Sequence, residues 1–408
     1  MVMVFGVRFT GPLTVHAEGF AAELSRLGYT RLSAQAPLLL MAQLSRWLVE
    51  QPYDVPLPPQ VICDFVASHG PTLASGDPVY SVTRSSGPVA LMVEHLRSAG
   101  VVGPCVQVES TLVETLLASY SDYMVTERGL ADSTVSRNVD AVRGFVAARM
   151  IDGRLDLAGL TAADVSAFML EVARERPAAT AQRTATALRS VLRFLHTTGI
   201  LNASLVGAVP SVACWQQTSL PRGLEPDEVA GLLASCDRRT RAGRRDFAVL
   251  LLLARLGLRS GEVARLTLDD VDWRVGEIVV DGKGARRDRL PLPDDVGRAV
   301  VAYLQRGRPA TAQGREVFVR LRAPHRRLTS SAVSHVVTAA GQRAGLRQVS
   351  AHRLRHTAAS QLLAAGAPLT EIGQLLRHRK AATTAIYAKV DREALRGLAR
   401  PWPGKGVA

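Results

Sequence analysis

Residues 350–356 read SAHRLRH, and residues 375–387 read LLRHRKAATTAIY. On a helix, residues three positions apart share a face, so His352 and Arg355 are expected side by side. Tyr387 ends the second stretch. The two stretches therefore concentrate basic side chains and one tyrosine in a short part of the chain, and they decide how the rest is interpreted.

Two further basic residues precede these stretches in unusual settings. Residues 256–262 read LGLRSGE and place Arg259 at a turn before a helix. Lys283 lies between two glycines, where short strands over 277–281 and 289–292 predict a hairpin.

Together these residues supply the chemical groups that phosphoryl transfer without a metal requires. The charge on phosphate oxygens must be neutralised by fixed cations, and arginine offers a bidentate fork for this. The reaction also needs a nucleophile and an acid for the leaving oxygen. The candidate catalytic residues are Arg259, Lys283, His352, Arg355, His378 and Tyr387.

Each of these residues alone has a more ordinary explanation. An arginine after Gly-Leu is usually on the surface, a lysine between glycines is usually a solvated hairpin tip, and a helical tyrosine is usually core. Residues 282–284 also lack the Gly-x-x-x-x-Gly-Lys-Ser/Thr pattern of a phosphate-binding loop. His352 and His356 have metal-ligand spacing, but no glutamate of a His-Glu-x-x-His motif lies between them, and we expect no metal. The order and spacing of the whole set favour the chemistry.

The excess of positive over negative charge is confined to the C-terminal half of the chain. The net charge is +14. From Glu225 to Ala408 there are 33 Lys and Arg against 18 Asp and Glu, and the first 224 residues hold 17 and 18. A basic balance of this size indicates a polyanionic partner, either nucleic acid or an anionic membrane. We expect a phosphate backbone to lie on the C-terminal half.

The composition is that of an ordinary globular protein, with 47% hydrophobic and 21% charged residues. No segment approaches the ~18 consecutive apolar residues of a membrane span, and residues 1–14 lack the pattern of a secretory leader. A soluble, cytoplasmic protein is expected. Its four cysteines form no C-x-x-C pair and are expected to be reduced thiols: Cys63, Cys105, Cys214 and Cys236.

Periodicity and linker composition divide the chain. We expect a helical module of unknown role over 1–105, a four-helix segment over 108–203, a linker over 204–224, a mixed domain over 225–400 and a tail over 401–408. Helices are expected over 33–51, 60–68, 89–98, 110–127, 133–150, 161–175, 178–198, 227–236, 245–255, 294–305, 330–344, 352–365 and 369–376.

Helix starts and basic stripes add detail to the segment over 108–203. Ser133 is the expected N-cap of its second helix, and Thr161 with Asp164 opens the third. The second and fourth helices carry arginines at helical intervals. Such stripes are usually solvated faces, but as candidate DNA contacts we name Arg137, Arg143, Arg183 and Arg189.

Residues 222–389 resemble the catalytic domain of the tyrosine recombinase, or phage integrase, family. All six candidate catalytic residues stand at the family's positions in the family's order, with Glu262 at the usual acidic position behind Arg259. The spacing is similar to that of Xer-type members. Arg286 and Arg287 follow the hairpin lysine and are further candidate DNA contacts.

The resemblance implies a mainly α fold with a small β-sheet. It implies a helical core-binding domain of the SAM-like kind over 108–203, which binds DNA, and a mixed α/β tyrosine-recombinase catalytic domain over 225–400.

It also implies a site-specific recombinase or integrase that cuts and rejoins DNA through a 3′-phosphotyrosine on Tyr387. Arg259 and Arg355 would clamp the phosphate and favour the phenolate of the tyrosine. Lys283 would protonate the 5′-hydroxyl leaving group, and His352 would transfer the tyrosine proton. His378 would hydrogen-bond the phosphate.

The implied partners are double-stranded DNA at specific sites and further copies of the chain in a tetramer. Partner recombinases or DNA-bending proteins are further candidates. Because the phosphotyrosine retains the bond energy, no cofactor is expected. Two alternatives stay open, namely strand relaxation of the type IB topoisomerase kind and a non-catalytic DNA-binding role.

Two features depart from the family's pattern. Arg377 stands where the family often has glycine, which puts the local backbone in doubt. The module over 1–105 has no counterpart in minimal members, which favours a recombinase of the longer, mobile-element kind.

Overall fold

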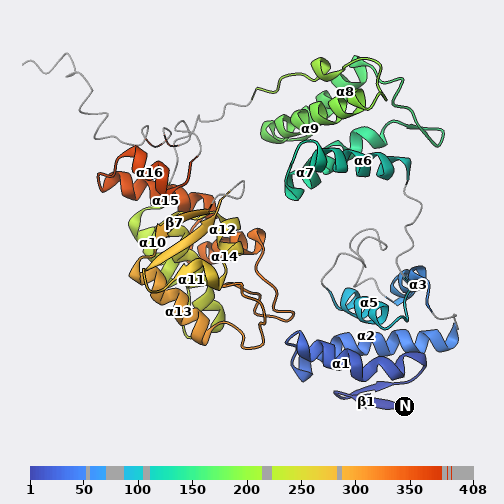
Figure 1. Cartoon of the computed structure of the whole chain (residues 1–408), viewed down its shortest axis with the longest axis horizontal. Helices are drawn as coiled ribbons and strands as arrows, with labels where there is room; N and C mark the ends of the chain where they lie inside the picture. The colour runs from blue at the N-terminus through green and yellow to red at the C-terminus, as the bar shows by residue number, and fades with distance from the viewer. Residues whose placement is uncertain are drawn as a thin grey trace, which may run out of the picture. The chain divides into compact units, whose positions relative to one another are not determined.

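The structure, a computed structural model, describes residues 1–51, 56–69, 87–103, 111–213, 223–282, 287–378, 384 and 387. It is mainly helical with small antiparallel sheets, which confirms the expected fold class (Figure 1). The chain divides into two compact units, Cys105–Thr218 and the combination of Met1–Pro104 with Ser219–Ala408. Among the described helices, none has the length and hydropathy needed to cross a membrane.

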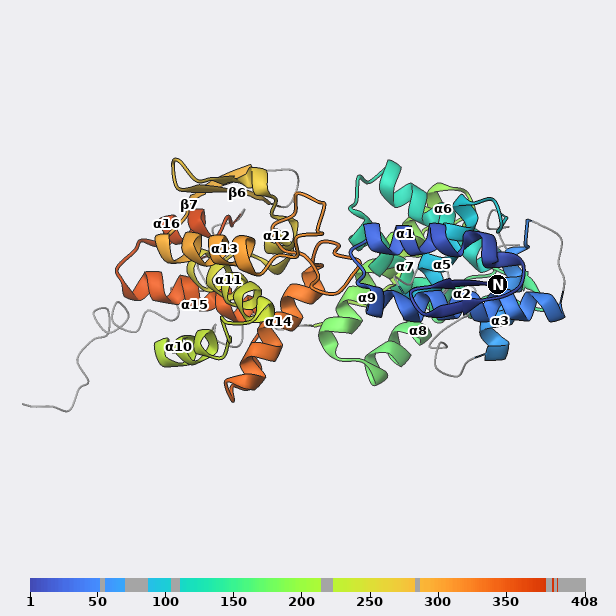
Figure 2. The same cartoon turned by 90° about the horizontal axis from the view of Figure 1, so that it is seen from below.

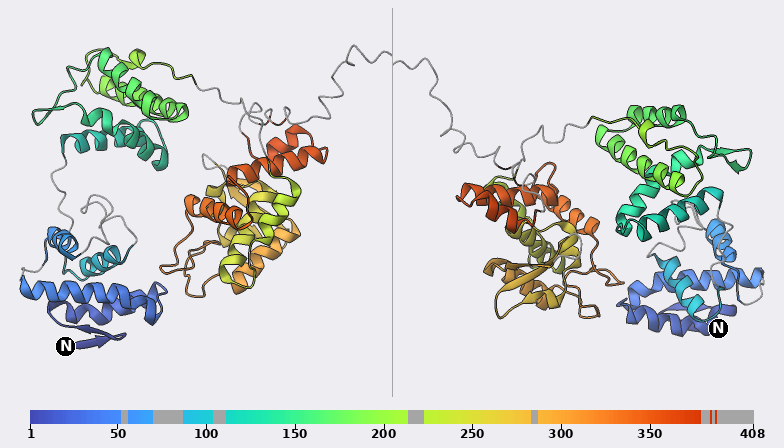
Figure 3. Two further views of the ribbon diagram at one scale, coloured as in Figure 1. Left: turned by 180° about the vertical axis from the view of Figure 1, so that it is seen from behind. Right: turned by 45° about the horizontal axis from the view of Figure 1, so that its top comes forward.

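The N-terminal module has a hydrophobic core of its own. Its elements are β1 (Val2–Val4), β2 (Val7–Phe9), η1 (Pro12–His16), α1 (Ala17–Arg26), α2 (Arg31–Glu50), α3 (Pro59–His69) and α5 (Pro88–Ser98). The β1–β2 hairpin packs against α1 and α2 (Figure 3). The three helices expected here are present. The hairpin and α1 were not expected, because three-residue strands hold no readable alternation and α1 has no capping side chain.

The unit Cys105–Thr218 contains the four expected helices around a second core. Its elements are α6 (Leu112–Thr126), α7 (Asp132–Ala147), β3 (Met150–Ile151), β4 (Arg154–Leu155), α8 (Ala162–Glu175), α9 (Ala178–Thr197) and η2 (Val206–Ala208). Thr161 and Asp164 form a reciprocal capping box at the start of α8, as expected. The prediction of Ser133 as an N-cap is wrong, because α7 begins at Asp132 after Ala131 without a capping side chain.

The C-terminal domain packs around α11, most of which is buried. Its elements are α10 (Pro226–Ala234), α11 (Arg241–Leu256), α12 (Ser260–Arg265), η3 (Leu268–Asp270), β5 (Val271–Asp272), β6 (Glu277–Asp281), β7 (Arg287–Pro291), α13 (Asp294–Arg306), α14 (Ser330–Arg343), α15 (Ala351–Ala364) and α16 (Leu369–Leu375). Both predicted strands are present, and the two-residue β5 extends them to an antiparallel sheet in the order β5-β6-β7. The sheet runs along one side of the helices (Figure 2).

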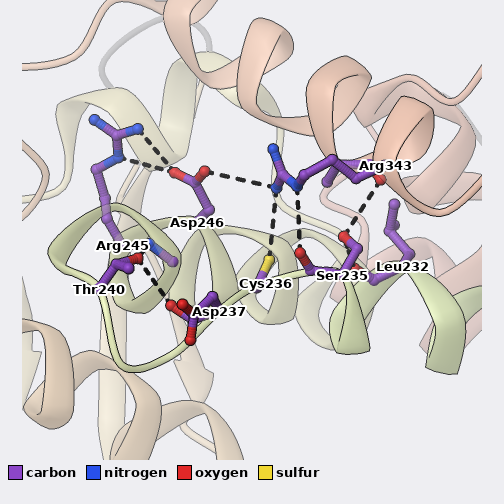
Figure 4. A network of polar contacts seen from close by, with 10 residues as sticks. Leu232, Ser235, Cys236, Asp237, Thr240, Arg245, Asp246 and Arg343 are labelled. Carbon is purple, nitrogen blue, oxygen red and sulfur yellow. Dashed lines mark hydrogen bonds and ion pairs between the residues drawn. The ribbon is translucent and has the colours of Figure 1, made fainter.

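A polar network joins α14 to the loop between α10 and α11 (Figure 4). The Nε of Arg343 donates to the Ser235 carbonyl over 3.2 Å, and its Nη2 lies 3.9 Å from Asp246 Oδ2. Asp246 also accepts from Arg245 over 2.8 Å. The buried Cys236 beside them has a free thiol, whose sulfur accepts from Arg343 Nη2 over 4.0 Å. The network ties α14 to the second turn of α11, a helix that α15 packs against.

We expect two glycine-to-alanine substitutions in this domain to act in opposite directions. A Cβ at Gly243, in the first turn of α11, would lie 1.9 Å from the Asp237 carbonyl oxygen. The backbone must therefore shift, and Gly243→Ala should destabilise the fold by about 1–3 kcal/mol. A Cβ at Gly231, in α10, meets nothing within 4 Å. Gly231→Ala should stabilise by about 0.5–1 kcal/mol, because it lowers the backbone entropy of the unfolded chain. Urea unfolding of both variants checks the pair, and equal midpoints would contradict it.

Candidate active site

Four of the six candidate catalytic side chains come from the ends of three helices. Helix α11 stops at Gly257, whose φ of 56° is left-handed, and Arg259 then caps α12. At the start of α15 the Ser350 hydroxyl accepts from the Arg353 N–H over 3.2 Å. His378 lies three residues after the last residue of α16 (Leu369–Leu375). The turns of the chain thus bring residues more than a hundred positions apart to one place.

Arg355 is the buried centre of the group, with 3% of its surface exposed. Its Nη1 donates to the Gly257 carbonyl over 2.5 Å, and its Nη2 donates to the Leu376 carbonyl. Burial, together with Arg259 and Arg377, lowers the pKa of the Arg355 guanidinium to about 10, which leaves it charged at neutral pH. Arg355 therefore ties the turn before α12 to the turn after α16.

Glu262 orients the first arginine. Its Oε1 accepts from Arg259 Nη1 over 2.6 Å, and its Oε2 accepts from the Arg259 backbone N–H over 2.8 Å. The Glu262 side chain is 2% exposed, whereas that of Arg259 is 44% exposed. Arg259 is thus held at one nitrogen while the rest of its guanidinium stays open to a ligand.

Arg377 explains the departure from the family's pattern. Its φ of 55° is left-handed, the conformation that glycine adopts most easily, so the backbone shape is kept despite the side chain. The guanidinium is buried and donates to Glu262 Oε2 over 2.7 Å and to the Leu375 carbonyl over 2.8 Å. Burial opposes ionisation of Glu262, but Arg377 and Arg259 outweigh it and hold the pKa of this carboxyl below its usual value.

Tyr387 is 1% exposed and lies against the histidines of the site. Its hydroxyl is 2.9 Å from His356 Nδ1, and its ring is parallel to that of His378 with centroids 6.4 Å apart. Burial raises the pKa of Tyr387, and Arg355 opposes this only in part. Arg355 thus favours the phenolate, as expected, but burial has the larger effect and the hydroxyl keeps its proton in this state.

The three histidines are linked to neighbours rather than isolated. His356 Nε2 lies 3.0 Å from His352 Nε2, and His378 Nδ1 lies 2.8 Å from Thr384 Oγ1. Burial, then His352, lowers the pKa of His356 to about 4; burial, then Arg355, lowers that of His378 to about 4. Both rings are neutral at pH 7. Within the described ranges, no group of three or more potential metal ligands forms.

Two of the predicted site residues, Lys283 and Arg286, lie outside the described residues. The strands that flank them are paired, with Asp281 opposite Arg287. Arg287 itself is exposed and forms ion pairs with Asp270 at 2.9 Å and Asp281 at 3.2 Å.

The arginines predicted as DNA contacts on α7 and α9 differ in how they are held. Arg143 is ion-paired with Glu114, and Arg189 donates to the carbonyls of Val209 and Pro210. The exposed Arg137 donates to Ser133 and Thr134, and the exposed Arg183 donates to Thr180, all within their own helices. Their role in DNA binding stays a prediction.

Sequence reasoning considered His356 only as a metal ligand and missed its contact with the tyrosine. The signal was present, because four residues separate His352 from His356 and such residues are neighbours on a helix. The contact between the Tyr387 hydroxyl and the ring nitrogen of His356 depends on tertiary packing, and no pattern in the neighbouring sequence predicts it.

Comparison with known proteins places this geometry in a family. Residues 222–394 match the Phage integrase family. The integrase/recombinase y4rA of Sinorhizobium fredii is 38% identical over 400 residues, which cover 97% of this chain and 96% of the relative. Tyrosine recombinase XerD of Mycobacterium tuberculosis is 34% identical over 303 residues, which cover 71% of this chain and 96% of the relative.

Solved structures share the fold at lower identity. XerH recombinase bound to its difH substrate in a pre-cleavage complex has a TM-score of 0.53 and 17% identity, and the match covers 72% of this chain and 96% of that chain. A lambda integrase tetramer bound to a Holliday junction has a TM-score of 0.51 and 17% identity, and the match covers 68% of this chain and 80% of that chain.

We expect Arg377→Gly to lower stability although glycine suits the backbone. Removing a left-handed side chain gains about 1–2 kcal/mol, but losing one partner of a buried pair costs about 3–5 kcal/mol. The pKa of Glu262 lies below its ordinary 4.5 in the folded chain, so the stabilisation is present above pH 4.5 and is lost as the pH falls further. The difference between wild type and variant should therefore be largest at neutral pH and shrink in acid.

Urea unfolding between pH 3 and 7 measures this difference. The matched control is Glu262→Gln, and the double variant Glu262→Gln, Arg377→Gly should be less destabilised than the sum of the two single changes. A pH-independent difference, or strict additivity, would show that the pair does not carry the effect.

Proposed function

The chain belongs to the phage integrase family and is a site-specific DNA recombinase of the tyrosine type, and we propose that Tyr387 is the residue with which it cuts and rejoins DNA. The observation that carries this proposal is the position of Tyr387. Its hydroxyl is hydrogen-bonded to His356 on α15, next to the buried Arg355. Tyr387 attacks the scissile phosphate, the bond from phosphorus to the 5′-oxygen breaks, and a 3′-phosphotyrosine is left.

The arginines supply the charge that this reaction requires. Arg259 presents an open guanidinium, and Arg355 supplies a fixed positive charge that its carbonyl partners hold in place. In the proposed reaction both stabilise the charge that develops on the non-bridging oxygens. Lys283 protonates the 5′-oxygen, and His378, already placed by Thr384, hydrogen-bonds the phosphate. The phosphotyrosine retains the energy of the broken bond, so a 5′-hydroxyl of another strand can reverse the step.

The proposed biological role is recombination of a mobile element. The likeness over nearly the full length is to an integrase/recombinase, whereas XerD matches a shorter part of the chain. The proposed assembly is a tetramer on two DNA sites, which the lambda integrase tetramer on a Holliday junction supports. Helices α6 to α9 are the proposed core-binding domain, with the exposed Arg137 and Arg183 as its first candidates for phosphate contacts.

A nicked suicide substrate tests the nucleophile. When the short cleaved strand diffuses away, rejoining is blocked and the covalent adduct accumulates. Wild type should form this adduct on DNA from the ends of its element, and Tyr387→Phe should form none, since it lacks the attacking oxygen. Tyr123→Phe removes a hydroxyl from α6 and should leave the adduct intact.

Denaturing gels separate the possible results. An adduct in Tyr387→Phe would reject the tyrosine assignment. Adducts on supercoiled DNA of any sequence would indicate relaxation of the topoisomerase kind, and DNA binding by wild type without an adduct would indicate an accessory protein.

Arg259→Ala should weaken stabilisation of the charge on the phosphate oxygens without unfolding the chain. We expect adduct formation to slow by about 10²–10³-fold, the usual cost of removing one preorganised donor. The fold should persist, because Arg259 is 44% exposed and Glu262 keeps its bond to Arg377. Arg255→Ala is a matched control, since its ion pair with Asp295 lies on the surface. Single-turnover cleavage and gel-shift binding check the prediction, which fails if Arg259→Ala cleaves at the wild-type rate.

A further inference from the structure

The hydroxyl of Tyr387 is bonded to a different histidine from the one expected to exchange its proton. The expectation assigned that exchange to His352. In the structure the hydroxyl lies 2.9 Å from His356 Nδ1, and His356 Nε2 lies 3.0 Å from His352 Nε2. The three side chains form an unbroken series of hydrogen bonds, with His356 in the middle.

The proton positions in this series follow from the chemistry of its members. Because burial keeps Tyr387 protonated, its hydroxyl donates and His356 Nδ1 accepts. A neutral imidazole carries its one proton on the other nitrogen, so His356 Nε2–H donates to His352 Nε2. His352 then carries its proton on Nδ1. Both hydrogen bonds are then donated in the direction from the buried tyrosine towards the exposed His352.

We propose that His356 is a catalytic residue that relays the proton of Tyr387 to His352 during strand cleavage. As the Tyr387 oxygen bonds to phosphorus, its proton moves to His356 Nδ1 and the Nε2 proton of His356 moves to His352 Nε2. His352 becomes the imidazolium. The 5′-oxygen leaves and takes its proton from Lys283, so protons and charge balance, and ligation reverses each transfer. This proposal rests on the proposed role of Tyr387.

The surroundings of His356 disfavour a protonated ring, so His356 passes the proton on rather than keeping it. The ring is part-buried on α15 beside the positive charge of Arg355, so an imidazolium there is disfavoured, in keeping with its lowered pKa. His352 lies on the first turn of the same helix, where burial, then Arg355 and Arg259, also lower the pKa of its ring. It therefore does not keep the proton, and its exposed surface lets it pass the proton to water. Tyr387 itself is 1% exposed and has no such outlet. A relay solves the problem of removing a proton from a buried nucleophile.

The alternative for His356 is that it only holds the tyrosine ring, which it contacts with centroids 5.5 Å apart. The two roles differ in one respect. A relay matters only while the tyrosine proton is hard to remove, whereas ring positioning matters whatever the acidity of the phenol. Lowering the pKa of the nucleophile therefore distinguishes them.

The experiment uses the full chain and a suicide substrate with a 5′-bridging phosphorothiolate, whose thiolate leaves without a proton donor, so that only nucleophile activation is measured. His356→Gln keeps a hydrogen-bonding side chain but cannot relay. It should cleave about 10²-fold or more slowly than wild type with unchanged DNA binding and thermal midpoint. A more acidic fluorotyrosine at position 387 should restore most of the rate. His16→Gln, in the N-terminal module, should cleave like wild type.

A second variant tests the relay independently of His356→Gln. His352→Gln should slow cleavage by a similar factor and be rescued by the same fluorotyrosine. The double variant should be no slower than either single one, because both interrupt one series. Should His356→Gln fail to fold, His352→Gln and its rescue carry the test.

The relay is overturned if His356→Gln cleaves at the wild-type rate, or if fluorotyrosine does not rescue a folded, DNA-binding variant. It is also overturned if the double variant slows cleavage by the product of the two single factors. A wild type that forms no adduct at all instead overturns the proposed function.

Discussion

The guanidinium of Arg355 holds the site together. It is buried in the domain and bonded to the carbonyls of Gly257 and Leu376, which belong to the turns on either side of the site. A charge in such a place is costly unless it is fully hydrogen-bonded. The two turns must therefore meet at α15, and this requirement places Arg259 and His378 near one helix face.

The second constraint is the charge of Glu262. It is almost fully buried and needs a cation, yet the cation beside it, Arg259, has to face a ligand. Arg377 resolves this conflict, because its buried guanidinium supplies a second partner and the group as a whole remains positive. An arginine at a left-handed backbone position is strained in isolation. Here the ion pair with Glu262 offsets that strain, which accounts for the departure from the usual glycine.

Long periodic segments were predictable, and short or contact-dependent ones were not. The expected helices are present because their apolar residues repeat at helical spacing from one turn to the next. The two-residue β5 and the three-residue β1 and β2 carry no such repeat, so only pairing reveals them. At the site, the order of the six residues indicated the reaction. The raised pKa of Tyr387 was not anticipated, because nearby arginines can be expected from sequence whereas burial cannot.

The sequence by itself determined the chemical inventory, the helical character, the concentration of positive charge in the C-terminal half and, through motif order, the family. These properties depend on residue identity and spacing, which are local. The tertiary structure alone decided which histidine contacts Tyr387, that Arg377 shares Glu262 with Arg259, and that Arg355 bonds to two backbone carbonyls. Those contacts join residues from 21 to 115 positions apart, and only packing of the helices around α11 sets such distances.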